Sequence, residues 1–148
     1  MIEIEIADEA WTRALPDPEG LARRAAEAAA GGEAGGEIAV LLTDDDALHE
    51  LNARFLGKDR PTNVLSFPDA SPDRLGDVAL AFGVCQREAG EQGKSLADHA
   101  THLVIHGVLH LLGYDHVADD EAARMEALER RLLAAMSIED PYADVRDR

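Results

Sequence analysis

Three histidines at the end of a long apolar segment restrict the fold of this chain more than any other feature. They follow the pattern His106-x3-His110-x2-Gly113-x2-His116. Residues four apart on an α-helix emerge from the same face, about one turn apart, so His106 and His110 can reach a single ion. Gly113 suits the left-handed backbone at a helix end, where the chain turns back. The pattern therefore predicts a helix capped by Ser95, followed by a turn that brings His116 to the same ion.

The three imidazoles predict a catalytic metal site. Zinc sites with three protein ligands keep a fourth position open for water, whereas structural sites are closed by four. We therefore expect one zinc ion per chain, bound by His106, His110 and His116. Asp115 is expected to orient a histidine ring or to cap the turn, and a role as a proton relay is the alternative. His102 lies one turn before the first ligand, and we interpret it as a residue that packs beside the site or supports a ligand.

The rest of the chain predicts a single α+β domain over residues 1–148. Alternating or continuous apolar stretches indicate four strands, at residues 2–6, 38–42, 64–67 and 77–82. Periodicity and capping residues indicate about five helices, near residues 19–30, 44–55, 84–92, 95–112 and 119–136. The fourth of these helices also carries His99, which we expect to be exposed. Residues from about 140 to 148 are predicted to form a polar tail.

The composition is that of a globular protein that can bury a core, with 46% hydrophobic and 30% charged residues. No apolar run approaches the roughly 20 residues that cross a bilayer. The first ten residues alternate apolar and acidic side chains and lack the basic start and apolar stretch of a signal peptide. These features predict a cytoplasmic protein without membrane contact.

The formal charge of −16 argues against broad, non-specific binding of nucleic acid, because a polyanion is repelled at long range. A local exception lies within residues 51–68. Arg54, Lys58 and Arg60 are opposed there only by Asp59, which gives a local balance of +2. This segment can engage a phosphodiester if it lies near the metal, although ordinary solvated loop charges explain it almost as well.

The histidine spacing is similar to the zinc signature of metzincin peptidases, H-E-x-x-H-x-x-G-x-x-H, with one difference. Gly107 occupies the position of the glutamate. That glutamate takes a proton from the metal-activated water and passes it to the leaving amine, which glycine cannot do. A metallopeptidase-like hydrolase is therefore an alternative that requires a glutamate from elsewhere in the chain.

Two blocks of sequence resemble the YbeY family of bacterial endoribonucleases and rRNA maturation factors. One is HGVLHLLGYDH at residues 106–116, and the other begins with Leu51 and Asn52 and runs through GKDRPTNVLSF at residues 57–67. The resemblance implies a zincin-like α+β domain with a small mixed four-stranded sheet, and zinc on His106, His110 and His116. It also implies cleavage of single-stranded RNA in small-subunit (16S) rRNA 3′-end maturation and ribosome quality control. The small ribosomal subunit and its assembly GTPase are the partners implied.

One position departs from the family pattern. An arginine that aids RNA cleavage usually stands just before the second block, and here that residue is Leu56. We therefore assign no catalytic residue from the sequence. Arg54, Lys58 and Arg60 are predicted to bind the RNA phosphates instead. The departure also supports a third hypothesis, a non-catalytic ribosome-assembly factor that binds metal.

Overall fold

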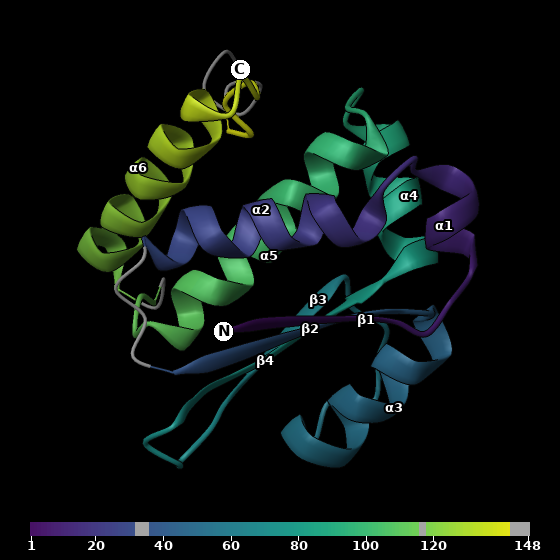
Figure 1. Ribbon diagram of the computed structural model, residues 1–148, viewed down its shortest axis with the longest axis horizontal. Helices are drawn as coiled ribbons and strands as arrows, with labels where there is room; N and C mark the ends of the chain where they lie inside the picture. The colour runs from purple at the N-terminus through teal and green to yellow at the C-terminus, as the bar shows by residue number, and fades with distance from the viewer. Residues whose placement is uncertain (32–35, 116–117, 143–148) are drawn as a thin grey trace.

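A computed structural model of the chain describes residues 1–31, 36–115 and 118–142. Its sheet has the order β1-β2-β4-β3, in which β1, β2 and β4 are parallel and β3 runs antiparallel to β4 (Figure 1). The four-stranded mixed sheet predicted from the sequence is confirmed. The strands are β1 (Ile2–Ile6), β2 (Glu37–Thr43), β3 (Val64–Pro68) and β4 (Arg74–Ala81).

Six helices lie within these residues, one more than expected. The additional helix is α1 (Ala10–Ala14), a five-residue turn that buries Trp11 completely and lets its indole N–H donate to the Thr43 carbonyl at 3.0 Å. The others are α2 (Pro18–Ala30), α3 (Asp45–Leu56), α4 (Phe82–Glu91), α5 (Leu96–Leu111) and α6 (Asp119–Ala135).

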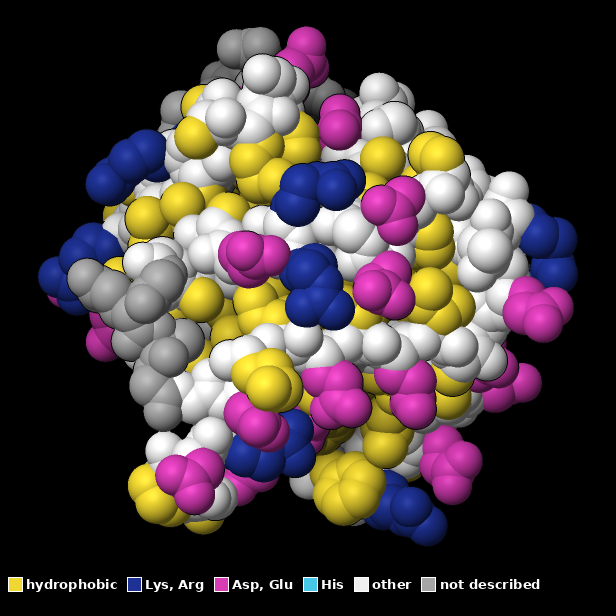
Figure 2. Space-filling view, viewed as in Figure 1, with side chains coloured by type: hydrophobic (Ala, Val, Ile, Leu, Met, Phe, Trp, Pro, Cys, Tyr) yellow, Lys and Arg dark blue, Asp and Glu magenta, His cyan; other side chains and the backbone are white. Residues whose placement is uncertain are grey.

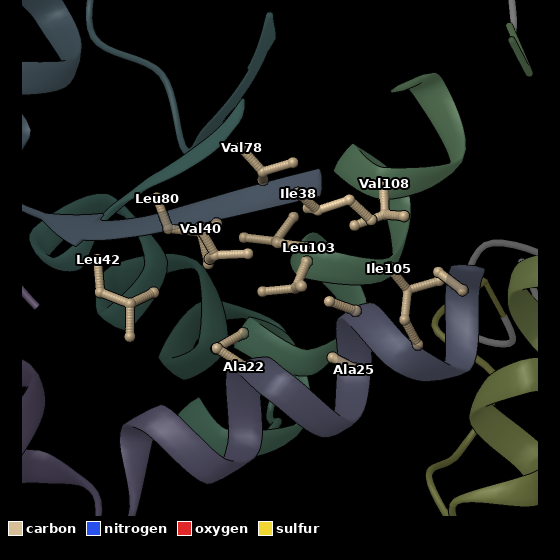
Figure 3. Close-up of a cluster of buried hydrophobic side chains, with 14 of the residues drawn as sticks. Ala22, Ala25, Ile38, Val40, Leu42, Val78, Leu80, Leu103, Ile105 and Val108 are labelled. Atoms are coloured by element: carbon tan, nitrogen blue, oxygen red, sulfur yellow. The ribbon is translucent and has the colours of Figure 1, made fainter. Parts of the chain in front are cut away.

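The sheet separates two apolar layers. On one face, alternate residues of β2 and β4 point toward α2 and α5, and Ile38, Val40 and Leu42 belong to the same buried cluster as apolar side chains of both helices (Figure 3). On the other face, α3 places Leu48 over Leu65 and the alanines of β4. Each fully buried aliphatic side chain contributes about 1.5–3 kcal/mol.

Helix α5 lies at the centre of the arrangement, in contact with α2, α4, α6 and strands β3 and β4. It begins where the sequence predicts, because the Ser95 side chain accepts a hydrogen bond from the Asp98 amide at 3.1 Å. Its apolar residues face the sheet and α2, so its histidines are left on the remaining side. Within the described ranges, no helix has both the length and the apolar character needed to span a membrane.

Candidate metal centre

His106 and His110 converge at the last two turns of α5. Their Nε2 atoms lie 3.1 Å apart, and their ring centroids are 4.6 Å apart with the rings nearly perpendicular. Both side chains are only partly buried, so the point between them is open to a ligand. The helix then ends, and Gly113 adopts a φ of 101°, as the predicted reversal of the chain requires.

The hydrogen bonds of the two rings determine which nitrogen carries each proton. His110 Nδ1 lies 3.0 Å from the carbonyl oxygen of Tyr114, which can only accept, so this nitrogen is protonated. His106 Nδ1 lies 2.9 Å from a carboxylate oxygen of Glu129 and donates to it. With Nδ1 of each ring engaged in these hydrogen bonds, Nε2 is the atom that each ring can offer to a shared cation.

The separation of these two atoms fits a metal ion. Two nitrogens bound to tetrahedral zinc at 2.0–2.1 Å lie about 3.3 Å apart. The observed 3.1 Å between His106 Nε2 and His110 Nε2 is close to that value. Both rings also have their second nitrogen hydrogen-bonded, as is usual for metal-ligating histidines. The third predicted ligand, His116, lies outside the described residues.

Glu129 of α6 is the buried carboxylate of the site. Its side chain has no exposed surface, and it accepts hydrogen bonds from His106 Nδ1 at 2.9 Å, His102 Nε2 at 2.8 Å and the Tyr142 hydroxyl at 2.6 Å. Burial alone would raise the pKa of Glu129, but these three donors together outweigh it and hold the pKa well below its usual range. Glu129 is therefore ionised and fixes His106 with Nε2 unprotonated.

A second possible ion position uses different atoms. His102, His106 and Glu129 each offer a ligand atom within 4.8 Å of the others, so this cluster can also bind a metal. An ion at that position would use Glu129 oxygens that now accept hydrogen bonds from the rings of His102 and His106. An ion between the two Nε2 atoms would instead keep the hydrogen bonds that Glu129 accepts from His102, His106 and Tyr142.

Gly107 is a packing requirement of this helix. A Cβ atom there would lie 2.6 Å from Val78 Cγ1 and 3.1 Å from the Ser66 hydroxyl, which donates to the Gly107 carbonyl at 2.9 Å. The residue thus faces strands β3 and β4, and the structure has no room for the glutamate of the peptidase signature. Glu129 does not replace that base, because both its oxygens are already hydrogen-bonded.

A cleft of about 550 Å³ adjoins His106. Its walls come from α4, α5, the start of β3 and the segment that follows α6. Lys94 is the cation among its lining residues, and its ammonium donates to the Pro141 carbonyl at 3.3 Å. The lining includes Asn63, Val64, Glu88, Glu91, His99, His102 and Tyr142.

The cations predicted to bind substrate do not line this cleft. Arg54 is exposed near the end of α3, with its guanidinium 5.8 Å from the centre of the Phe55 ring. Lys58 and Arg60 are exposed in the loop that follows. Leu56, at the position of the family's arginine, is 47% exposed. The face of the molecule that includes α3 shows its basic side chains interspersed with acidic ones (Figure 2).

One prediction about a side chain near the site needs correction. His99, expected to be exposed, is 3% exposed, because α4 covers it and Glu88 accepts from its ring at 2.9 Å. The ring of His106 is oriented by Glu129 and that of His110 by the Tyr114 carbonyl. The start of the predicted polar tail, residues 140–142, is described next.

The segment from residue 140 to 142 packs against α6 and the site. The Asp140 carboxylate accepts from Arg130 at 3.2 Å and from the Tyr142 amide at 2.8 Å, which turns the Tyr142 hydroxyl toward Glu129. Neither Glu129 nor Tyr142 was predicted to be functional. Glu129 lies on the apolar face of the amphipathic helix α6. A carboxylate at such a position is the sequence signal that could have identified this residue as part of a site.

The fold and the site together define a zincin-like α+β protein whose cluster of histidines and a glutamate can bind a metal ion. A family model described as Endoribonuclease YbeY matches residues 5–137. The chain therefore belongs to the Endoribonuclease YbeY family.

Individual relatives agree with this assignment. A protein named Endoribonuclease YbeY from Paramagnetospirillum magneticum is 50% identical, over 97% of this chain and 96% of the relative. One of the same name from Rhodopseudomonas palustris is 48% identical, over 96% of this chain and 81% of the relative. The solution structure of TM1509 from Thermotoga maritima superposes with a TM-score of 0.61 at 27% identity, covering 93% of this chain and 92% of that one.

Proposed function

We propose that this chain is an endoribonuclease that cuts single-stranded RNA with one zinc ion on His106, His110 and His116. The observation that carries the proposal is the convergence of His106 Nε2 and His110 Nε2 to 3.1 Å while Nδ1 of each ring is hydrogen-bonded elsewhere. Membership of a family described as endoribonuclease supports RNA as the substrate. An ion bound there would supply Lewis acidity toward a phosphoryl oxygen.

The chain's own residues have distinct tasks in this proposal. Glu129 accepts from His106 Nδ1 and thereby turns Nε2 toward the metal position, while His102 and Tyr142 keep Glu129 ionised and in place. Lys94 contributes positive charge to a cleft that also contains Glu88 and Glu91. Because the described part of the cleft is not basic, the metal would be its main attraction for phosphate.

The cellular role we propose is maturation of the 3′ end of small-subunit (16S) rRNA and ribosome quality control in the cytoplasm. The partners would be the small ribosomal subunit and its assembly GTPase. Residues 1–148 would act as one domain. Arg54, Lys58 and Arg60 are proposed to contact RNA that extends beyond the cleft, since all three are exposed.

The test is cleavage of a labelled single-stranded RNA by zinc-loaded protein, compared with protein stripped by a chelator and then reloaded. His110→Ala should lose both zinc and cleavage, because it removes one of the converging Nε2 atoms. His49→Ala is the matched control for zinc content, since its ring belongs to α3 and hydrogen-bonds Asp59. Unchanged cleavage by a folded, zinc-free His110→Ala protein would defeat the proposal.

A non-catalytic assembly factor is the second candidate, favoured by the exposed apolar side chain of Leu56 where the family has an arginine. Leu56→Arg separates the two candidates. If the natural chain binds zinc but does not cut RNA, and Leu56→Arg restores cutting, the second candidate is correct. Digestion of a casein-type substrate would instead favour a peptidase.

A further inference from the structure

A carboxylate in the cleft beside His106 is held by two donors from different elements. Glu88 of α4 accepts, at the same oxygen Oε1, from Asn63 Nδ2 at 2.9 Å and from His99 Nε2 at 2.9 Å. Burial, opposed by the Glu88 hydrogen bond, lowers the pKa of His99, so the ring is neutral near pH 7 and donates through Nε2–H. The Glu88 side chain is therefore fixed in one orientation.

Two acceptor atoms remain available in this arrangement. Within the described residues, no group donates to Glu88 Oε2 or to Asn63 Oδ1, and both side chains line the cleft. The Glu88 side chain is 31% exposed, which leaves its carboxylate accessible to a ligand. His99 is committed elsewhere, and its buried Nδ1 has no hydrogen-bond partner in the described part of the chain. Glu88 Oε2 and Asn63 Oδ1 are therefore fixed acceptors in the cleft, and they are suited to a ligand that carries adjacent hydrogen-bond donors.

We propose that this part of the cleft binds a guanine base of the single-stranded RNA substrate, with Glu88 Oε2 accepting from its N2 amino group and Asn63 Oδ1 from its N1–H. The inference rests on the proposed function. Guanine is the RNA base that carries two adjacent donors on its Watson–Crick edge, the edge that proteins read in unpaired RNA. The two available acceptors, one from each side chain, match these two donors.

The position of Glu88 suits a nucleotide whose phosphate lies at the metal. His99, which contacts Glu88, precedes His106 by seven residues on α5, a separation of roughly 10 Å along the axis. The volume of about 550 Å³ lies within the range of about 300–1,000 Å³ that is usual for small-ligand pockets. Val64, Leu103 and Tyr142 supply apolar and aromatic walls for the faces of a base.

The test compares three labelled RNA trimers, U-G-U, U-I-U and U-A-U, for binding to the zinc-loaded full chain. Inosine lacks only the 2-amino group of guanosine. Removing a hydrogen bond to a charged group costs about 1.5–3 kcal/mol, so U-G-U should bind at least about tenfold more tightly than U-I-U. Free guanosine monophosphate, measured in parallel, should bind more weakly than U-G-U, because it lacks a phosphodiester to place at the metal.

Glu88→Gln is the decisive variant. Its amide oxygen can keep both existing hydrogen bonds at the Oε1 position, while the amide nitrogen replaces the free acceptor with a donor. The variant should fold, keep its zinc and bind U-G-U and U-I-U equally. Glu27→Gln removes the same charge from an exposed position on α2 that does not line the cleft and should retain the preference.

Each result has a separate meaning for the two proposals. Equal binding of U-G-U and U-I-U by the natural chain, or a preference that survives in Glu88→Gln, overturns the guanine site even if RNA is cut. Tighter binding of free guanosine monophosphate than of U-G-U overturns RNA as the source of the base. Selective binding of U-G-U without any RNA cleavage leaves the guanine site standing and removes the proposed nuclease activity.

Discussion

Replacing Glu129 with glutamine should weaken metal binding by about 10- to 100-fold, the usual effect of losing a carboxylate that orients a ligand histidine. The side chain keeps its size, but one acceptor oxygen becomes an amide nitrogen. Since Oε2 accepts from both His102 and Tyr142, the remaining oxygen is expected there, with the nitrogen facing His106 Nδ1. The amide N–H of the glutamine and the Nδ1–H of His106 would then be two donors that point at each other. His106 avoids this by carrying its proton on Nε2, and a protonated Nε2 cannot bind the metal.

The loss corresponds to about 1.4–2.7 kcal/mol of metal-binding free energy, at 1.4 kcal/mol for each tenfold change. The assay is competition for zinc between the protein and a chromophoric chelator at pH 7.5. Glu126→Gln is the matched control on α6, because it removes a carboxylate that is 38% exposed and only pairs with Arg130 at 3.4 Å. Such exposed ion pairs contribute about 0–1 kcal/mol, so zinc affinity should be unchanged.

Natural zinc affinity in a folded Glu129→Gln protein would refute this reasoning. A second comparison identifies the ion's position. If zinc lies between the two Nε2 atoms, His110→Ala should abolish binding, whereas His102→Gln, which keeps a donor toward Glu129, should retain most of it. The opposite result would place the ion among His102, His106 and Glu129.

Two further predictions concern stability. Gly107→Ala should destabilise the fold by about 1–3 kcal/mol, because the added Cβ would lie too close to Val78. Urea unfolding measures the change in free energy of unfolding. An unchanged free energy would contradict the prediction and show that β4 can shift to make room. Because burial, partly opposed by Glu88, lowers the pKa of His99, the unfolded chain binds the proton more readily. Stability should therefore fall as pH drops below about 6.5, the ordinary histidine pKa, and the fall should be smaller in His99→Gln; an equal fall in both would contradict this.

The electrostatics of the chain bear on how it can recognise RNA. With a net charge of −16 and acidic side chains among the basic ones on the face shown in Figure 2, long-range attraction of RNA is weak. Recognition would then depend on short-range contacts at the metal and at Glu88. An acidic surface disfavours binding of RNA regardless of its sequence. A requirement for a specific unpaired base near the cleavage site is consistent with this.

Features that depend on neighbours along the chain could be predicted from the order of the residues alone. The cap at Ser95, the four-residue spacing of His106 and His110 and the reversal at Gly113 follow from helix geometry, and the structure has all three. The alternation of apolar residues likewise gave the four strands. The resemblance to a known family rests on the same local blocks, and it gave the mixed sheet.

Only the tertiary structure decided which distant groups meet the histidines. Glu129 reaches His106 from 23 positions away because α6 packs beside α5, and Tyr142 reaches Glu129 because Asp140 turns the following segment inward. The burial of His99 against Glu88 depends in the same way on how α4 crosses α5. Helical periodicity fixes which face a side chain occupies, but the partner of that face is set by packing of the whole chain.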